Sequence, residues 1–394
     1  MDRLGLLNQG IPWFIQISAY VFFSIIVVLL MQMISIVYHT SEITSTEKSI
    51  CFPLQMLLFL LVVIFSSFRY IRIDSYQFKG YNNYFNIGGI DTLSYLGFYE
   101  SADNYSLKEY INEIPMEKFY AIIFWVFYHL HLDYKSVLCL NYLIVYAALI
   151  KYCKVFDLRS KYFLPLISLL IIVIQSYNTL RWSTSLLLSI WVIDAILNNK
   201  LLRAFVLTLI FSLCFHIGSL SLLVPVFGFI FSKNLRKPNR IFLFFISVLF
   251  VCLFIYAFPL EKILGDSRLV AHLTSGGGMP LAWSLLYLFY IFNVFYIRKK
   301  YFESEFRKKM FFICFFLMPL CLPEIKMMMM YRFSHFGHIV TYFGLVELLK
   351  VNKKINVGII FNGIIYLLLL LNILTFYGND IISCGVPYIF GTLL

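Results

Sequence analysis

Residues 204–231 read AFVLTLIFSLCFHIGSLSLLVPVFGFIF, and this apolar run lies between the basic loops Lys200–Arg203 and Lys233–Arg240. As one straight helix it would measure about 42 Å, which is too long for one crossing of a roughly 30 Å hydrocarbon core and too short for two. Loops rich in Lys and Arg favour the cytoplasmic side, so the run must enter the membrane and return. We therefore predict a broken or re-entrant helix near 204–231.

Three residues inside this run supply the break: Gly218, Pro225 and Gly228. Non-helical backbone at membrane depth survives only where it is buried in protein or lines a wet cavity. His216 lies just before the break, and an ionisable residue within a membrane is a candidate for function by default. A satisfied core histidine is the competing interpretation.

The composition of the whole chain indicates a membrane protein. Of its 394 residues, 61% are apolar and only 13% are charged, whereas a soluble domain carries about 25% charged residues. This excludes an ordinary cytoplasmic enzyme and a disordered chain. The net charge of +12 comes from bases in short loops, where they fix orientation and do not indicate a nucleic acid partner. The eight cysteines contain no CxxC pair, so we expect no metal site and no disulfide framework.

Apolar runs recur along the entire chain, and a membrane crossing needs about 20 such residues. We expect an all-α polytopic membrane protein with about 11–13 transmembrane segments, forming a single integral membrane domain over residues 1–394. The first run is too long for a cleavable signal and should stay in the membrane. The candidate segments are 11–38, 50–68, 117–132, 136–152, 161–177, 179–198, 204–231, 241–260, 281–297, 310–323, 332–349 and 355–376.

The charge pattern leaves the side of the longest polar stretch, residues 69–116, open. If 117–132 and 136–152 both crossed, this loop would share the cytoplasmic side with the basic loop Lys151–Lys161; if only one crossed, it would be external. Its four bases against six acids favour the outside. A second outer loop is expected at 261–280.

The sequence FRYIRIDSY at 68–76 is a polar cluster at a membrane boundary. Arg69 and Arg72 can clamp a phosphate with a planar fork, Asp74 can take a proton from a hydroxyl group, and Tyr76 can stack on a sugar. The pattern fits a polar, ring-shaped ligand. It fits equally well a helix end with a snorkelling arginine and an interfacial aromatic belt.

Further cations lie on the side opposite the basic loops. Arg181 begins a predicted span, Arg268 lies in the second outer loop, and Arg332 and His335 are three residues apart and share a helix face. Several cations facing an outer cavity favour an anionic ligand such as a lipid-linked diphosphate. Interfacial snorkelling is the alternative for each arginine. No HExxH motif is present, and we predict no metal.

Together these motifs resemble the EpsG-like branch of bacterial polysaccharide polymerases, the Wzy-type O-antigen and capsule polymerases. The similarity extends over about residues 65–343. Trp182 stands where the family often has Gln, and Ile73 stands where it commonly has Gly. The matching features are Arg69, Asp74, Tyr76 and Tyr81 after the second span, Glu117 at the start of the next, Asn178 with Arg181, Phe215-His216 with Ser219-Leu220, and Arg332.

The resemblance implies a family C-like glycosyltransferase membrane fold and a periplasmic 69–116 loop. The implied enzyme joins undecaprenyl-diphosphate-linked oligosaccharide repeats at the periplasmic face of the bacterial inner membrane, without a cofactor. Its implied partners are these lipid-linked oligosaccharides, membrane lipid and a chain-length regulator protein. We assign the leaving diphosphate to Arg181 and Arg332, then Arg69, with Arg72, Arg268, His335 and Tyr76 as further binding residues. Asp74 is the leading candidate for the base, with Glu117 and His216 as alternatives.

Three other functions remain open. An O-antigen ligase uses the same donor, but such ligases usually carry a large external loop late in the chain, and the late loops here are short. A lipid-linked oligosaccharide flippase or other transporter needs two pseudo-symmetric halves, and no repeat relates residues 1–197 to 198–394. A membrane acyltransferase would rest on His216 alone.

Overall fold

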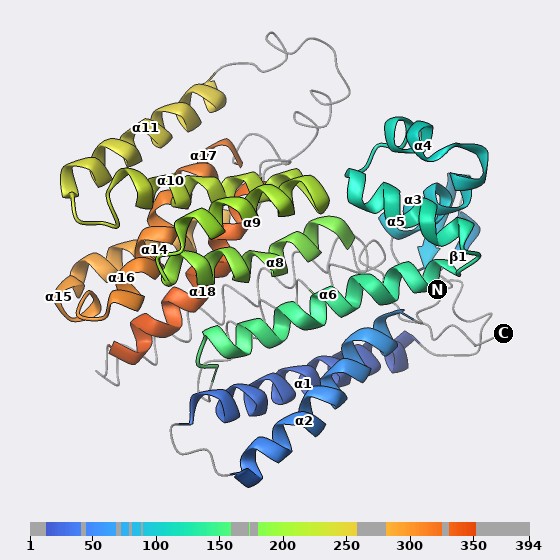
Figure 1. The fold of residues 1–394 in the computed structure, drawn as a ribbon, viewed down its shortest axis with the longest axis horizontal. Helices are drawn as coiled ribbons and strands as arrows, with labels where there is room; N and C mark the ends of the chain where they lie inside the picture. The colour runs from blue at the N-terminus through green and yellow to red at the C-terminus, as the bar shows by residue number, and fades with distance from the viewer. Residues whose placement is uncertain are drawn as a thin grey trace. The chain divides into compact units, whose positions relative to one another are not determined.

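The described residues are almost entirely helical (Figure 1), and with their apolar composition they confirm an all-α membrane protein. Contacts divide them into two compact units. The first contains the described residues up to Leu188 together with Leu213–His216, and the second contains Ser189–Ser212 and the described residues from Ile217 onward. The computed structural model describes residues 13–40, 45–67, 72–78, 81–87, 90–158, 173, 180–257, 281–324 and 331–351.

Three helices of the described residues are long and apolar enough to cross a membrane: α6 (Tyr134–Val155), α8 (Leu180–Leu197) and α11 (Pro238–Ala257). Shorter apolar helices accompany them, among them Ile50–Ile64 and Leu201–Cys214. Most of the expected run 161–177 and all of 355–376 lie outside the described residues. The number of crossings and the single-domain organisation therefore stay predictions.

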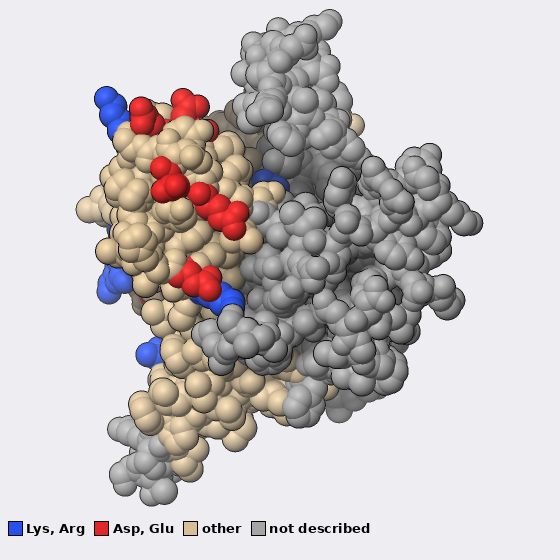
Figure 2. All heavy atoms as spheres, turned by 90° about the vertical axis from the view of Figure 1, so that its right-hand side faces the viewer, with Lys and Arg blue, Asp and Glu red and all other residues tan. Residues whose placement is uncertain are grey.

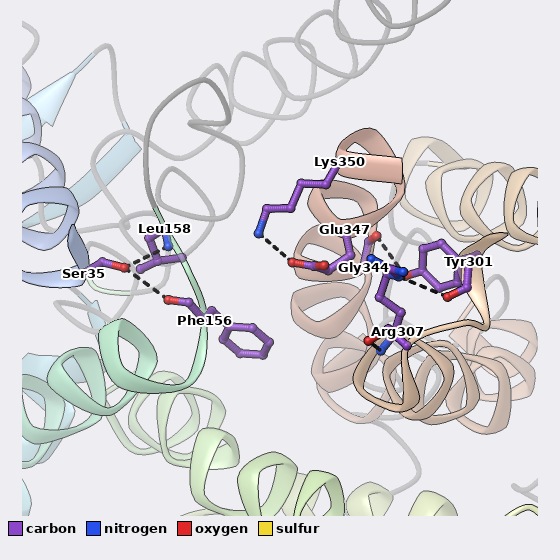
Figure 3. Close-up of polar contacts among 9 residues, drawn as sticks. Ser35, Phe156, Leu158, Tyr301, Arg307, Gly344, Glu347 and Lys350 are labelled. Carbon is purple, nitrogen blue, oxygen red and sulfur yellow. Dashed lines mark hydrogen bonds and ion pairs between the residues drawn. The ribbon is translucent and has the colours of Figure 1, made fainter. Parts of the chain in front are cut away.

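The first unit is built around α6, which packs against α1 and the α2–η2 pair. A polar junction joins α1 to the end of α6: Ser35 Oγ accepts the Leu158 N–H at 2.9 Å and donates to the Phe156 carbonyl at 3.2 Å (Figure 3). The elements of this unit are α1 (Trp13–His39), α2 (Ser45–Phe59), the π-helical η2 (Leu60–Phe65), β1 (Arg72–Phe78), β2 (Tyr81–Ile87), α3 (Ile90–Glu100), η3 (Ser101–Asn104), α4 (Leu107–Glu113), α5 (Lys118–His129), α6 and the start of α8.

A small helical layer of α3, η3, α4 and α5 lies at the opposite end of α6, beside Tyr134 (Figure 1). The Tyr99 hydroxyl donates to the Leu132 carbonyl, and the Tyr134 ring lies 5.6 Å from the Tyr99 ring and 6.0 Å from the Phe124 ring. Since α6 runs from Tyr134 to Val155, about 26 Å of helix separates Tyr134 from Lys151 and about 30 Å separates it from Lys154.

The expected span 117–132 is the 12-residue helix α5, which belongs to this layer. A helix of that length covers about 18 Å, well short of the roughly 30 Å hydrocarbon core. Of the two runs 117–132 and 136–152, only the second, as α6, is therefore long enough to cross. With a single crossing between them, residues 90–116 and the bases at the end of α6 lie at opposite ends of this helix. This resolves the question that the charge pattern left open.

The polar stretch 69–116 contains more structure than an extended loop. Strands β1 and β2 form an antiparallel hairpin in which Asp74 pairs with Phe85 and Tyr76 pairs with Asn83. A capping box starts α4, because Ser106 Oγ accepts the Glu109 N–H and the Glu109 carboxylate accepts the Ser106 N–H. The hairpin is an addition to the predicted all-α architecture.

The predicted break in 204–231 is confirmed: Gly218 lies within it, whereas Pro225 and Gly228 do not. Helix α9 (Leu201–Cys214) ends before Phe215 and His216, and the 3-10 segment η4 (Ile217–Leu222) leads into α10 (Leu223–Phe231). Pro225 lies in the first turn of α10, where a missing N–H is tolerated. Gly228 serves packing instead: a Cβ there would lie 2.6 Å from the Phe316 ring.

The second unit packs α14 against α18 through glycines on α18. A Cβ on Gly337 would lie 1.4 Å from the Tyr287 hydroxyl, and one on Gly344 would lie 2.5 Å from the Tyr290 ring. The other elements of this unit are the rest of α8, most of α9, η4, α10, α11, α14 (Leu281–Tyr296), α15 (Arg298–Tyr301), α16 (Glu305–Leu317), η5 (Met318–Leu320), α17 (Cys321–Glu324) and α18 (Tyr331–Val351).

Tyr301 fixes the basic segment between α14 and α16 to the end of α18. Its buried hydroxyl lies 2.9 Å from the Tyr290 hydroxyl. It also donates to the Gly344 carbonyl at 3.3 Å (Figure 3). Arg307 Nε donates to the Tyr301 carbonyl at 3.1 Å, and Lys350 pairs with Glu347 one turn earlier on α18. The basic loop is therefore tied to the helix ends that it connects.

We expect Gly337→Ala to lower the free energy of unfolding by about 1–3 kcal/mol, because the added methyl group overlaps Tyr287 and forces α14 away from α18. Thermal unfolding in detergent measures the loss. Adding Tyr287→Phe to this variant removes the overlapped hydroxyl and should recover part of it.

The matched control is Gly97→Ala on α3, where a Cβ would meet nothing within 4 Å. That change should leave the midpoint unchanged or raise it slightly, since alanine restricts the unfolded chain. A Gly337→Ala protein as stable as the Gly97→Ala protein would contradict the close α14–α18 contact.

Candidate functional site

Arg181, in the first turn of α8, is held by two side chains from the small helical layer. Its Nη1 forms an ion pair with the Glu117 carboxylate. Its Nε donates to the Tyr95 hydroxyl at 3.2 Å, and the guanidinium carbon lies 5.2 Å from the centroid of the Tyr95 ring. The predicted phosphate-binding cation therefore sits against a carboxylate and a tyrosine ring.

Glu117 is the N-cap residue of α5, yet its side chain makes no capping hydrogen bond. An N-cap side chain normally accepts a backbone N–H from the first turn of its helix. Here the carboxylate reaches Arg181, and its side chain is only 15% exposed, against 19% for Arg181. The Glu117 side chain therefore leaves the N-terminus of α5 without a side-chain cap and places a mostly buried negative charge beside Arg181.

A buried hydrogen-bond network lies one helix turn from this ion pair. Asn141 Oδ1 on α6 accepts the Tyr120 hydroxyl at 2.7 Å and the Thr184 hydroxyl at 2.9 Å. Tyr120 follows Glu117 by three residues and Thr184 follows Arg181 by three, so each lies one turn along the same helix face. Asn141 therefore fixes the spacing between the helices that carry the ion pair.

His216 lies close to the same helices. The residue before it, Phe215, packs its ring 5.3 Å from Phe119 and 5.9 Å from Tyr120. His216 is itself buried and comes directly before η4. The break in 204–231 thus packs Phe215, the residue before this histidine, against α5.

The α18 residues Arg332, His335 and His338 belong to the second unit. His335 and His338 are buried, with ring centroids 5.6 Å apart, and His338 lies 5.0 Å from Tyr287. Among the described residues, no group of three or more His, Cys, Asp or Glu is placed to hold a metal ion.

The other predicted site residues are only partly visible or not visible. Arg69 and Arg268 lie outside the described residues. Arg72, Asp74 and Tyr76 occupy alternate positions of β1, which fixes their backbone alone. Their functional assignments stay predictions.

Sequence reasoning missed Tyr95, Tyr120, Asn141 and Thr184. Tyr95 and Tyr120 are two of 28 tyrosines, so composition alone could not single them out. Thr184 follows Arg181 by three residues and could have been noted for that spacing. Asn141 carries a weaker signal, as a lone amide within a predicted span.

The surface around this layer is acidic. Figure 2 shows acidic side chains gathered on the side of the molecule where α3, α4 and α5 lie. The exposed acids of this layer are Glu100, Asp103, Glu109 and Glu113. The positive charge of Arg181 is therefore local, since the exposed acids belong to the same layer that supplies Glu117 and Tyr95.

We expect Asn141→Ala to lower the free energy of unfolding by about 1–3 kcal/mol, because the Tyr120 and Thr184 hydroxyls lose their common acceptor. Thr184→Val is the matched control and should cost less, since Tyr120 keeps its partner. Denaturation of both variants in detergent tests this order. Equal stability of the Asn141→Ala and wild-type proteins would contradict a supporting role for the network.

A family model described as the EpsG family matches residues 80–390, most of the chain. None of the curated proteins and none of the solved structures compared with the chain matches it. The matched range includes Tyr95, Glu117, Arg181, His216 and Arg332 and starts after the 68–76 cluster. The resemblance inferred from the motifs is confirmed: the chain belongs to the EpsG family.

Proposed function

We propose that this protein is a membrane glycosyltransferase that joins undecaprenyl-diphosphate-linked oligosaccharide repeats into an O-antigen or capsular polysaccharide. EpsG family membership indicates a polysaccharide polymerase type of role. The observation that carries the finer assignment is the Arg181–Glu117–Tyr95 cluster. It places a mostly buried arginine, oriented by two partners, at one end of a membrane-spanning helix.

The arrangement of unit 1 supports a periplasmic position for this cluster. Lys151 and Lys154 lie in the last turns of α6, and such bases favour the cytoplasm. Because α6 is long enough to cross the membrane, the small helical layer at its other end falls on the outer side. Helix α8 agrees, since it runs from Arg181 to the basic segment that begins at Lys200.

The chemistry requires a group that binds the departing diphosphate. In the proposed reaction an acceptor sugar hydroxyl attacks the anomeric carbon of the donor chain, and the bond from that carbon to the diphosphate oxygen breaks. Charge develops on the leaving oxygens, where a planar guanidinium can donate two hydrogen bonds. We assign this role to Arg181, with Arg332 and Arg69 as further cations.

Asp74 remains the first candidate to take the proton of the acceptor hydroxyl, with His216 and Glu117 as alternatives. His216 gains support from Phe215, the residue before it, which packs against α5. The donor lipid implies the bacterial inner membrane as the location. A chain-length regulator protein is the proposed partner.

We expect Arg181→Ala to reduce polymerisation by about 10²–10³-fold, the loss typical when one donor to a developing oxyanion is removed. Arg181→Lys should recover part of the activity, because an ammonium keeps the charge but not the planar fork. The assay reconstitutes purified protein in vesicles with a lipid-diphosphate oligosaccharide and displays the product as a ladder on a gel, with a parallel EDTA lane.

Arg203→Ala, at an exposed base in the first turn of α9, is the matched control and should polymerise normally. An Arg181→Ala protein that gives a normal ladder would contradict the assignment of Arg181. Transfer of the lipid across the vesicle bilayer without any ladder from the wild-type protein would instead identify a flippase.

A further inference from the structure

The contacts of Arg181 leave part of its guanidinium unused. Nε is taken by Tyr95 and Nη1 by Glu117, while Nη2 makes no hydrogen bond with a described residue. Within the same part of the chain, Arg181 is the sole hydrogen-bond partner of the Glu117 carboxylate. The pair therefore satisfies the charge of Arg181 but not all of its donors.

A mostly buried arginine needs a counter-charge when no ligand is bound, because an unpaired charge in such a place is strongly unfavourable. A diphosphate ligand carries more negative charge than one carboxylate and offers more acceptor oxygens. A diphosphate that binds the planar fork across Nη1 and Nη2 needs the Nη1 donor that Glu117 occupies. The Glu117 carboxylate must then be exchanged for the ligand when the ligand arrives.

The local structure permits this exchange without unfolding α5. Glu117 has an extended backbone at the helix start, and its side chain caps none of the helix N–H groups. A change of its side-chain rotamer therefore breaks the ion pair and no helix hydrogen bond. Tyr95 contacts Nε, away from the edge that faces Glu117, and keeps the guanidinium oriented during the exchange.

We propose that Glu117 is an internal counter-anion: a substrate diphosphate displaces it from Arg181, and its return expels the spent lipid diphosphate after each transfer. This deepens the proposed function and rests on it for the identity of the ligand. Glu117 is thus a positioning residue that sets the affinity and the residence time of the diphosphate on Arg181.

The test measures binding of two probes, inorganic diphosphate and farnesyl diphosphate, to the full-length protein in detergent. Glu117→Gln removes the competing charge, and we expect it to bind both probes about tenfold more tightly, within the usual range of coupling between two sites. Glu117→Asp keeps the charge and should stay near the wild-type affinity. Glu113→Gln, at an exposed acid of the same layer, is the matched control and should change nothing.

A double-mutant cycle separates exchange from general electrostatics. Arg181→Ala should bind neither probe measurably, and Arg181→Ala with Glu117→Gln should behave in the same way. If Glu117→Gln tightened binding without Arg181, the pair would not be the site of exchange. If a folded Glu117→Gln protein bound the probes no more tightly than wild type, the proposal would be overturned.

Folding of the variants is checked by thermal unfolding with and without inorganic diphosphate. Glu117→Gln should unfold at a lower temperature in the absence of the probe, because Arg181 loses its counter-charge. The probe should then raise its midpoint more than it raises that of the wild type. An equal rise in both proteins would contradict the exchange.

Turnover distinguishes this proposal from the proposed function. With a lipid-diphosphate oligosaccharide, Glu117→Gln should slow in the steady state by about tenfold, and added inorganic diphosphate should inhibit it at a lower concentration than it inhibits the wild type, because diphosphate leaves Arg181 slowly. Suppose that Glu117→Gln binds the diphosphate probes more tightly but the wild-type protein makes no ladder. The polymerase assignment would then be wrong, and the exchange at Arg181 would still hold. A wild-type ladder with unchanged Glu117→Gln affinity would do the reverse.

Discussion

The arrangement of the candidate site depends on the ion pair between Arg181 and Glu117. A guanidinium at the start of a membrane-spanning helix needs a partner, and Glu117 supplies one from α5. The Asn141 network lies one helix turn from this pair and joins α5, α6 and α8 through Tyr120 and Thr184. Because the charges are mostly buried, the position of α5 is coupled to the pairing of Arg181.

Helix α6 determines how the elements of the first unit are arranged. One of its ends is tied to α1 through Ser35, and the other supports the small helical layer through Tyr134. A membrane helix can carry such polar contacts only where protein surrounds them. The result is one end that bears bases and one end that bears Arg181 among acidic helices. The proposed function would use this separation, since its donor and acceptor would meet on one side.

Hydropathy and charge in the sequence predict the helices and the break in 204–231, because both are local properties. They also single out Arg181, whereas Glu117 is singled out by the family resemblance, as a separate residue. The contacts between them do not follow from the sequence: Glu117 is 64 residues and Tyr95 is 86 residues from Arg181. Of the three residues predicted to supply the break, Gly218 lies in the 3-10 segment η4, whereas Pro225 and Gly228 lie within α10, where Gly228 packs against Phe316. The span 117–132 was overestimated because α5 is apolar on its packed faces without being long enough to cross.

The most direct test of the central claim is a cryo-electron microscopy structure of the protein with a non-transferable lipid-diphosphate sugar analogue. We expect diphosphate oxygens at hydrogen-bond distance, about 2.7–2.9 Å, from the Arg181 guanidinium. Glu117 should have moved away, and Arg181 Nε should still donate to the Tyr95 hydroxyl. A diphosphate bound elsewhere, with the Arg181–Glu117 pair intact, would contradict it.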